Sequence, residues 1–188
     1  MEQNERKRNK IFTTKRITLM AVFTALAFVV SLFDFPIFPA TPFLQLDFGN
    51  TFILLIGFLL GPIEGVVVCV LKELIRIPTG STGGVGELAN MLVTSAYILL
   101  PSIVYRYKKG LKYVIPSLAT ACVIGTCAAL IANRYINFPL YMGQGAAAVF
   151  AETFWFIVGF NLIKTVAISV LTLLLYKRLS NFIKGLKV

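Results

Sequence analysis

The sequence predicts an all-α integral membrane protein with six transmembrane helices and with its N- and C-termini in the cytoplasm. Three observations support this fold class. Apolar residues make up 57% of the 188 residues and charged residues only 14%, whereas a soluble domain has about 45–50% and about 25%. The mean hydropathy is +0.83. The basic residues also gather in clusters that give the helices one orientation. We expect a single membrane domain, residues 1–188.

Six apolar stretches account for the helices, because a membrane-spanning helix needs about 20 apolar residues. We expect spans roughly at residues 16–33, 48–60, 62–77, 86–106, 113–134 and 150–177. The second and third share one continuous stretch, Gly49–Ile77, which is long for a single helix. Gly61-Pro62 divides this stretch, and glycine followed by proline favours a tight hairpin of two short helices.

The basic residues decide between one helix and two in that stretch. Before the first span, between the fourth and fifth, and after the last lie three clusters, formed by Arg6, Lys7, Arg8, Lys10, Lys15 and Arg16, by Arg106, Lys108, Lys109 and Lys112, and by Lys177, Arg178, Lys184 and Lys187. Six spans place all three clusters on one side, as the positive-inside rule requires, whereas five would not. Residues 1–15 are therefore expected to form a basic cytoplasmic tail.

Several function classes are excluded by what the sequence lacks. The basic excess is explained by orientation, so we expect no nucleic-acid partner. The chain has no His, the commonest general base and metal ligand. The three cysteines form no C-x-x-C pair, so no metal site is expected. The glycine-rich run Pro78–Asn90 has Glu87 where a phosphate-binding loop has Gly-Lys-Ser/Thr, which argues against an ATPase within this chain.

Three segments are expected on the outer side: residues 34–48, 78–86 and 134–145. In the first, Pro36, Pro39 and Pro42 recur every third residue and favour extended backbone over helix. Two interpretations of this Phe-rich segment are open. It packs on the helix ends as part of an aromatic belt, or it forms a lid over a cavity, with Gln45 and Asp47 offering polar contacts to a ligand.

In the predicted topology, a group of polar residues lies in the outer half of the protein. Asn161 and Lys164 are three residues apart on one helix face, and Lys164 lies about 18 Å from Glu152 along the helix. A buried ammonium costs several kcal/mol unless it is paired or hydrated, so Lys164 either pairs with Glu87 or Glu152 or faces a ligand. The polar residues that converge here are Gln45, Asp47, Glu87, Asn90, Asn133, Asn161 and Lys164. They suit a small, flat, hydrogen-bonding ligand. For Lys72, Glu73 and Arg76, the sequence is equally consistent with a structural role and with a role in binding.

These motifs together resemble the riboflavin-specific S components of energy-coupling factor (ECF) transporters, over residues 15–178. The resemblance rests on Pro42–Asp47, on Gly61-Pro62 followed by Lys72-Glu73, on Gly83–Asn90, and on Asn161–Lys164. It implies a multi-pass protein of the bacterial cytoplasmic membrane, six helices, and riboflavin bound near the outer face under the 34–48 loop. It implies no cofactor and no enzymatic activity, because separate ATPase subunits hydrolyse ATP.

The resemblance also implies which residues take part. Substrate contacts are expected from Phe43, Leu44, Gln45, Leu46, Asp47, Gly84, Glu87, Asn90, Asn133, Tyr141, Asn161 and Lys164. Ala21 and Ala25 form a small-x-x-x-small pair, a spacing that lets another helix approach closely. In this family such a pair contacts the transmembrane coupling subunit, which works with two cytoplasmic ATPases.

Two alternatives remain open at this point. One is an S component for another vitamin such as thiamine, although Lys164 argues against a cationic ligand. The other is an intramembrane enzyme. Without His, that enzyme needs a Ser–Lys arrangement, and no Ser lies one helical turn from Lys164.

Overall fold

The computed structural model describes residues 13–80 and 82–185, with side chains described as far as Tyr176. Most of the predicted basic tail, residues 1–15, therefore lies outside the described residues. The elements in chain order are α2 (Thr14–Ser31), β1 (Phe35–Pro36), β2 (Gln45–Leu46), α3 (Asn50–Leu59), α4 (Pro62–Arg76), a 3₁₀ turn (Ile77–Thr79), α5 (Val85–Tyr107), α6 (Leu111–Ala132), a π-helical turn (Asn133–Asn137), α7 (Phe138–Met142), a 3₁₀ turn (Gly143–Gly145) and α8 (Ala146–Gly185).

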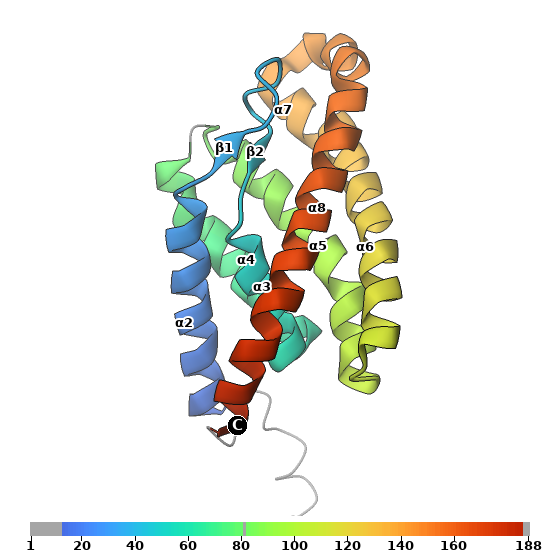
Figure 1. Ribbon diagram of the computed structural model, residues 1–188. Coiled ribbons are helices and arrows are strands. Elements are labelled where there is room, and N and C mark those ends of the chain that lie inside the picture. The colour runs from blue at the N-terminus through green and yellow to red at the C-terminus, as the bar shows by residue number, and fades with distance from the viewer. Residues whose placement is uncertain (1–12, 81, 186–188) are drawn as a thin grey trace, which may run out of the picture.

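The helices form an elongated bundle whose two ends differ (Figure 1). The β1–β2 hairpin and α7 lie at one end, which we call the outer half. The start of α2, the connection from α5 to α6 and the end of α8 lie at the opposite end, which we call the inner half. The described basic residues in the first turn of α2, around the connection from α5 to α6, and in the last turns of α8 thus all belong to the inner half.

The ambiguous stretch folds as two separate helices, α3 and α4, as Gly61-Pro62 predicts. Gly61 has φ of 139° and Pro62 is the first residue of α4, so a residue with a side chain would be strained at the turn. Eight of the ten residues of α3 are buried. A short helix that is apolar on all sides is typical of the interior of a bundle.

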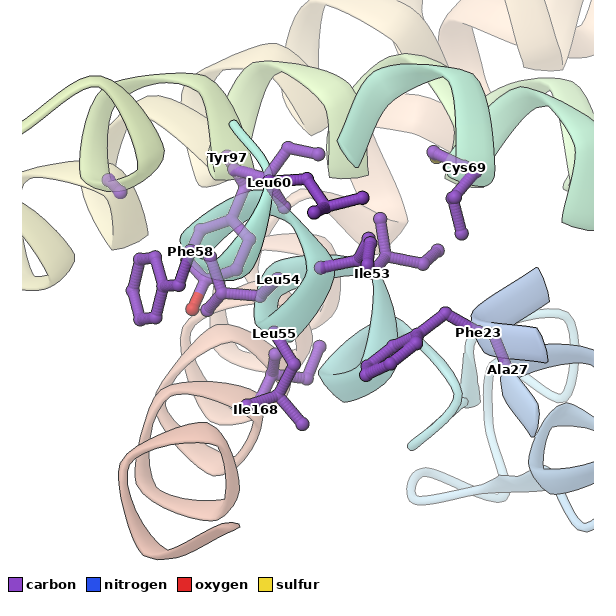
Figure 2. Packing of buried hydrophobic residues seen from close by; sticks show 14 of the residues in the cluster. Phe23, Ala27, Ile53, Leu54, Leu55, Phe58, Leu60, Cys69, Tyr97 and Ile168 are labelled. Carbon is purple, nitrogen blue, oxygen red and sulfur yellow. The ribbon is translucent and has the colours of Figure 1, made fainter. Parts of the chain in front are cut away.

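The inner half is held by a continuous apolar cluster around α3 (Figure 2). Ile53, Leu54 and Leu55 of α3 are fully buried. Phe23 of α2 and Ile168 of α8 pack against them from either side. Between helices in a membrane, close van der Waals packing replaces the hydrophobic driving force, so this cluster holds α2, α3 and α8 together in the inner half.

Helix α2 lies at the edge of the bundle and has one buried and one exposed face. Its buried residues Met20, Phe23, Thr24 and Ala27 follow the spacing of one helical face and pack on α3 and α4. At its inner end, Arg16 donates to the Leu60 carbonyl at 2.8 Å and pairs with Glu64 at 3.2 Å. Ala21 and Ala25 lie on the exposed face.

The first outer segment is extended, in agreement with its proline spacing. β1 and β2 pair in antiparallel fashion, with Phe35 opposite Leu46 and Pro36 opposite Gln45. The third outer segment is helical: a π-helical turn, α7 and a 3₁₀ turn join α6 to α8. α8 has 40 residues, which gives it a length of about 60 Å, well beyond the apolar thickness of a bilayer.

Three helical stretches are long and apolar enough to cross a membrane: Thr14–Ser31, Val85–Tyr107, and the continuous stretch Leu111–Tyr176 that contains α6 and α8. α3 is apolar but shorter. The fold is thus that of a helical membrane protein, and the number of spans depends on how α3 and α4 are counted.

Candidate binding site

A cavity opens in the outer half between the β1–β2 hairpin and helices α4 to α8. The empty space there, including the open mouth, is about 940 Å³. Ten of the twelve predicted contact residues line it: Phe43, Leu44, Gln45, Asp47, Glu87, Asn90, Asn133, Tyr141, Asn161 and Lys164. Segments far apart in the sequence therefore meet around one space.

Leu46 and Gly84 do not lie on this lining. Leu44, Gln45 and Asp47 line the cavity, whereas Leu46 is buried in the same apolar cluster as Leu44 and Phe138. Gly84 has φ of 93° directly before α5. Its role is conformational, because this left-handed turn favours glycine.

One wall of the cavity is apolar and aromatic. The rings of Phe43 and Phe138 meet edge to face with centroids 5.6 Å apart. Leu44, Val93 and Phe160 continue this wall. Such a surface suits a flat apolar ring system, which gains from contact with aromatic edges and faces.

Another part of the lining carries a buried network of charges. Lys72 is fully buried and donates to Asp47 and, at 2.7 Å, to Glu73 Oε1. Asn90 also donates to Glu73 Oε1. Burial by itself raises the pKa of Asp47, but the ammonium groups of Lys72 and Lys164 outweigh this effect and keep that pKa below its usual value. The Asp47 carboxylate is therefore ionised and fixed by its cationic neighbours.

Lys164 reaches the cavity from α8 without a carboxylate partner among the described residues. Its Nζ donates to Asn90 Oδ1 at 2.7 Å and lies 5.7 Å from the centroid of the Phe160 ring. Of the two alternatives for Lys164, the pairing with Glu87 or Glu152 is not formed among the described residues. Because Lys164 has other donor hydrogens, it can donate to an acceptor on a ligand.

Four asparagines line the cavity together with Lys164: Asn90, Asn133, Asn137 and Asn161. Asn161 donates one amide hydrogen to the Ile157 carbonyl at 2.9 Å, and Asn133 donates one to the Ala129 carbonyl at 2.8 Å. These bonds fix each amide to its own helix. Each amide has a second hydrogen and an oxygen, so it can read a mixed donor and acceptor edge.

An arginine links the segments at the mouth of the cavity. Arg76 donates to Asp34 and to the Ser31 carbonyl, and its Nε lies 3.7 Å from Glu87 Oε1. Glu87 Oε2 accepts from Thr82 at 2.9 Å. The end of α2, the end of α4 and the start of α5 are thus connected by one guanidinium.

Sequence reasoning missed about half of the lining: Asp34, Glu73, Arg76, Thr82, Val85, Gly86, Ala89, Val93, Ala129, Asn137, Phe138, Met142 and Phe160. Most are small or apolar and look like ordinary helix residues in the sequence. Five are polar: Asp34, Glu73, Arg76, Thr82 and Asn137. The sequence signal was strongest at Glu73, because a carboxylate within an apolar segment is itself a sign of function.

Comparison with known proteins agrees with this geometry. Residues 15–176 match the family model described as "ECF transporter, substrate-specific component". The chain belongs to this family. It is therefore a transport component and not an enzyme.

The similarity to known proteins extends over nearly the whole chain. The chain is 32% identical to "Riboflavin transporter RibU" of Staphylococcus aureus (strain TCH60), over 96% of this chain and 98% of that protein. It is 26% identical to "Riboflavin transporter FmnP" of Bacillus subtilis (strain 168), over 90% and 94%. A solved structure entitled "Structure and mechanism of the S component of a bacterial ECF transporter" has a TM-score of 0.79 and 33% identity, covering 91% of this chain and 98% of that one.

Proposed function

We propose that this S component binds riboflavin with high affinity in the outer cavity and delivers it for ATP-driven uptake. The observation that carries the proposal is the cavity itself, which combines an aromatic wall with four asparagines and with Lys164, whose ammonium is held by an asparagine oxygen. The names of the two relatives, both riboflavin transporters, support the same ligand.

The chemistry of riboflavin suits the two walls. Its isoalloxazine ring is flat and apolar on both faces, so Phe43, Leu44 and Phe138 are its contacts. Its pyrimidine edge mixes donors and acceptors, and we assign Asn161, Lys164 and Asn133 to that edge. The ribityl hydroxyls then meet Gln45, Asp47, Glu87 and Asn90, with Tyr141 at the side of the α7 segment.

A cationic vitamin such as thiamine suits this cavity less well. Lys164 is buried and contributes a positive charge to the lining, and a second cation beside it would be repelled in a medium of low dielectric constant. A neutral ligand with acceptor groups avoids that cost.

We further propose six membrane spans, with both termini in the cytoplasm of a bacterial cell. The basic residues at the inner end support this orientation. α3 supports the count: although it is only ten residues long, it is enclosed by other helices, so α3 and α4 together pass through the apolar layer as a hairpin. The cavity then opens to the outside.

The exposed face of α2 is the proposed contact with the coupling subunit. Ala21 and Ala25 leave a narrow strip of that face without bulky side chains, so a partner helix can approach the backbone closely there. ATP hydrolysis is assigned to two separate cytoplasmic subunits of the ECF module.

The absorption spectrum of the chain purified in detergent tests the ligand assignment. We expect a yellow preparation that releases one riboflavin per chain on denaturation. A colourless preparation that also fails to quench the fluorescence of added riboflavin would reject the flavin assignment, and thiamine would be the next ligand to test.

A further inference from the structure

The largely buried helix α3 begins with a polar residue, Asn50, whose side chain is fully buried. An asparagine at the start of a helix commonly caps that helix through its side chain. Here the side chain instead bonds α5. Asn50 Nδ2 donates to Asn90 Oδ1 at 2.9 Å and to Thr94 Oγ1 at 3.0 Å, and Asn50 Oδ1 accepts from Asn90 Nδ2 at 3.3 Å. Asn50 and Thr94 lie behind the cavity lining, to which Asn90 belongs.

The hydrogen bonds of this region converge on the Asn90 amide. Besides the bond from Asn50, its Oδ1 accepts from the Thr94 hydroxyl at 3.1 Å and from Lys164 Nζ at 2.7 Å. Its Nδ2 also donates to Glu73 Oε1. Both polar atoms of Asn90 therefore have partners within the protein. Asn90 lines the cavity with these atoms already in use, whereas the Lys164 ammonium keeps further donor hydrogens.

The position of the Lys164 ammonium depends on Asn90. Lysine carries its charge on a flexible four-carbon stem, and in the described part of the chain the hydrogen-bond acceptor of Lys164 Nζ is Asn90 Oδ1. A binding group must be held within about 0.5 Å of its productive position by the packing and hydrogen bonds of its neighbours. Whatever holds the Asn90 amide therefore also sets where the ammonium lies.

Building on the function proposed above, we propose that Asn50 and Thr94 are positioning residues for riboflavin binding. They hold the Asn90 amide, and Asn90 Oδ1 holds the Lys164 ammonium where it meets the pyrimidine edge of the flavin. Neither Asn50 nor Thr94 contacts the ligand. Their effect on affinity passes through Lys164, which distinguishes this role from a general contribution to the packing of α3 on α5.

The substitution Asn50→Leu tests this role, alone and combined with Lys164→Met. Leucine has a similar size but no hydrogen-bonding group, so the Asn90 amide loses part of its support. We expect the Kd for riboflavin, measured by quenching of flavin fluorescence, to rise about tenfold in Asn50→Leu. Residues that act through one network have non-additive effects. The double variant should therefore bind within about twofold of Lys164→Met alone.

Thr51→Val is the matched control. Thr51 is the next residue of α3, it is 2% exposed, and its hydroxyl has no hydrogen-bond partner among the described residues. It does not belong to the cavity lining. The Kd for riboflavin should stay within about twofold of the parent chain, with or without Lys164→Met. A rise as large as that in Asn50→Leu would overturn the inference, because any change at the start of α3 would then weaken binding.

The double variant also separates this inference from the proposed function. If Asn50→Leu raises the Kd by the same factor with and without Lys164→Met, its effect does not pass through the lysine and the inference is overturned. An unchanged Kd in Asn50→Leu would overturn it as well. Failure of the wild-type chain to bind riboflavin would instead reject the proposed function.

Thr94→Val covers the case in which Asn50→Leu does not fold. Valine has nearly the same shape as threonine, and the change removes one of the donors to Asn90 Oδ1. We expect a smaller rise in the Kd for riboflavin, about threefold, and no further rise when Thr94→Val is added to Lys164→Met. An equal rise in both backgrounds, or none in either, would overturn the inference.

Discussion

The inner and outer halves of the bundle use buried polar groups in opposite ways. In the inner half, the charged and aromatic polar groups pair within the protein: the Tyr97 hydroxyl bonds Ser169 at 2.7 Å, and Arg16 pairs with Glu64. In the outer half, Lys164 and Asn161 line the cavity and keep donor hydrogens that their bonds within the protein do not use. The comparison teaches that the inner half maintains the fold, while the outer half holds groups ready for a ligand.

Single helices show the same contrast along their length. α4 begins with Glu64 in the inner half and ends with Lys72, Glu73 and Arg76 around the cavity. α3 connects the two halves, because Asn50 at its start donates to Asn90 while Leu54 lies in the inner apolar cluster. A substitution at one end of a helix should therefore affect a different property from a substitution at the other end.

The largest effect is expected from Lys72→Met, which removes the cation between two buried carboxylates. Asp47 and Glu73 would be left without their ammonium partner, and breaking a buried pair in this way costs about 3–5 kcal/mol. Denaturant unfolding in detergent measures this loss of stability. Lys109→Met, at an exposed lysine, is the control and should unfold like the wild type. An unchanged unfolding midpoint for Lys72→Met would mean that the network contributes nothing to stability.

A slightly smaller loss is expected from Leu54→Ala in the inner half. Leu54 is fully buried in the apolar cluster, so its truncation leaves a cavity and costs about 2–5 kcal/mol of stability. The folded fraction should bind riboflavin with the wild-type Kd, measured by quenching of flavin fluorescence. A Kd that rises together with the loss of stability would break the separation between the halves.

Asn161→Ala should have the converse effect. The amide is proposed to meet the pyrimidine edge of riboflavin, and its loss leaves that edge unpaired, which weakens binding by about 1–3 kcal/mol. Thr120→Ala is the control, since Thr120 also bonds a carbonyl of its own helix at 3.0 Å but is exposed elsewhere on α6. Wild-type affinity in Asn161→Ala would remove this residue from the proposed site.

The smallest effect on binding is expected from Ala25→Leu on the exposed face of α2. The Kd for riboflavin should stay within about twofold of the wild type, because Ala25 is remote from the cavity and surface changes are small in effect. Uptake with the coupling and ATPase subunits present should nevertheless fall strongly. Ala119→Leu, at an exposed alanine of α6, should leave uptake intact, and equal uptake in both variants would contradict the proposed contact.

The sequence predicted much of the fold because its signals are local. Gly61-Pro62 predicted the turn between α3 and α4, and the proline spacing predicted the extended first outer segment. Asn161 and Lys164 could be placed on one face because helical spacing is regular.

Other features depend on contacts between distant segments. The bond from Asn90 to Glu73 could not be predicted, since the sequence shows only that Lys72 and Glu73 are neighbours, and the fold brings Asn90 beside them. Leu46 could not be assigned to a face without the pairing of β1 with β2. The bond between Lys164 and Asn90 joins residues 74 positions apart, which no local pattern encodes.

The division between the two halves is tested most directly by one measurement, the rise in unfolding midpoint that riboflavin produces in Leu54→Ala and Asn161→Ala. A ligand at 100 times its Kd stabilises the folded state by about 2.7 kcal/mol. We expect Leu54→Ala to unfold earlier than the wild type but to keep this riboflavin-dependent rise. Asn161→Ala should unfold like the wild type without ligand and lose most of the rise at the same riboflavin concentration. If both variants lose stability and the rise together, the halves are not separate in function.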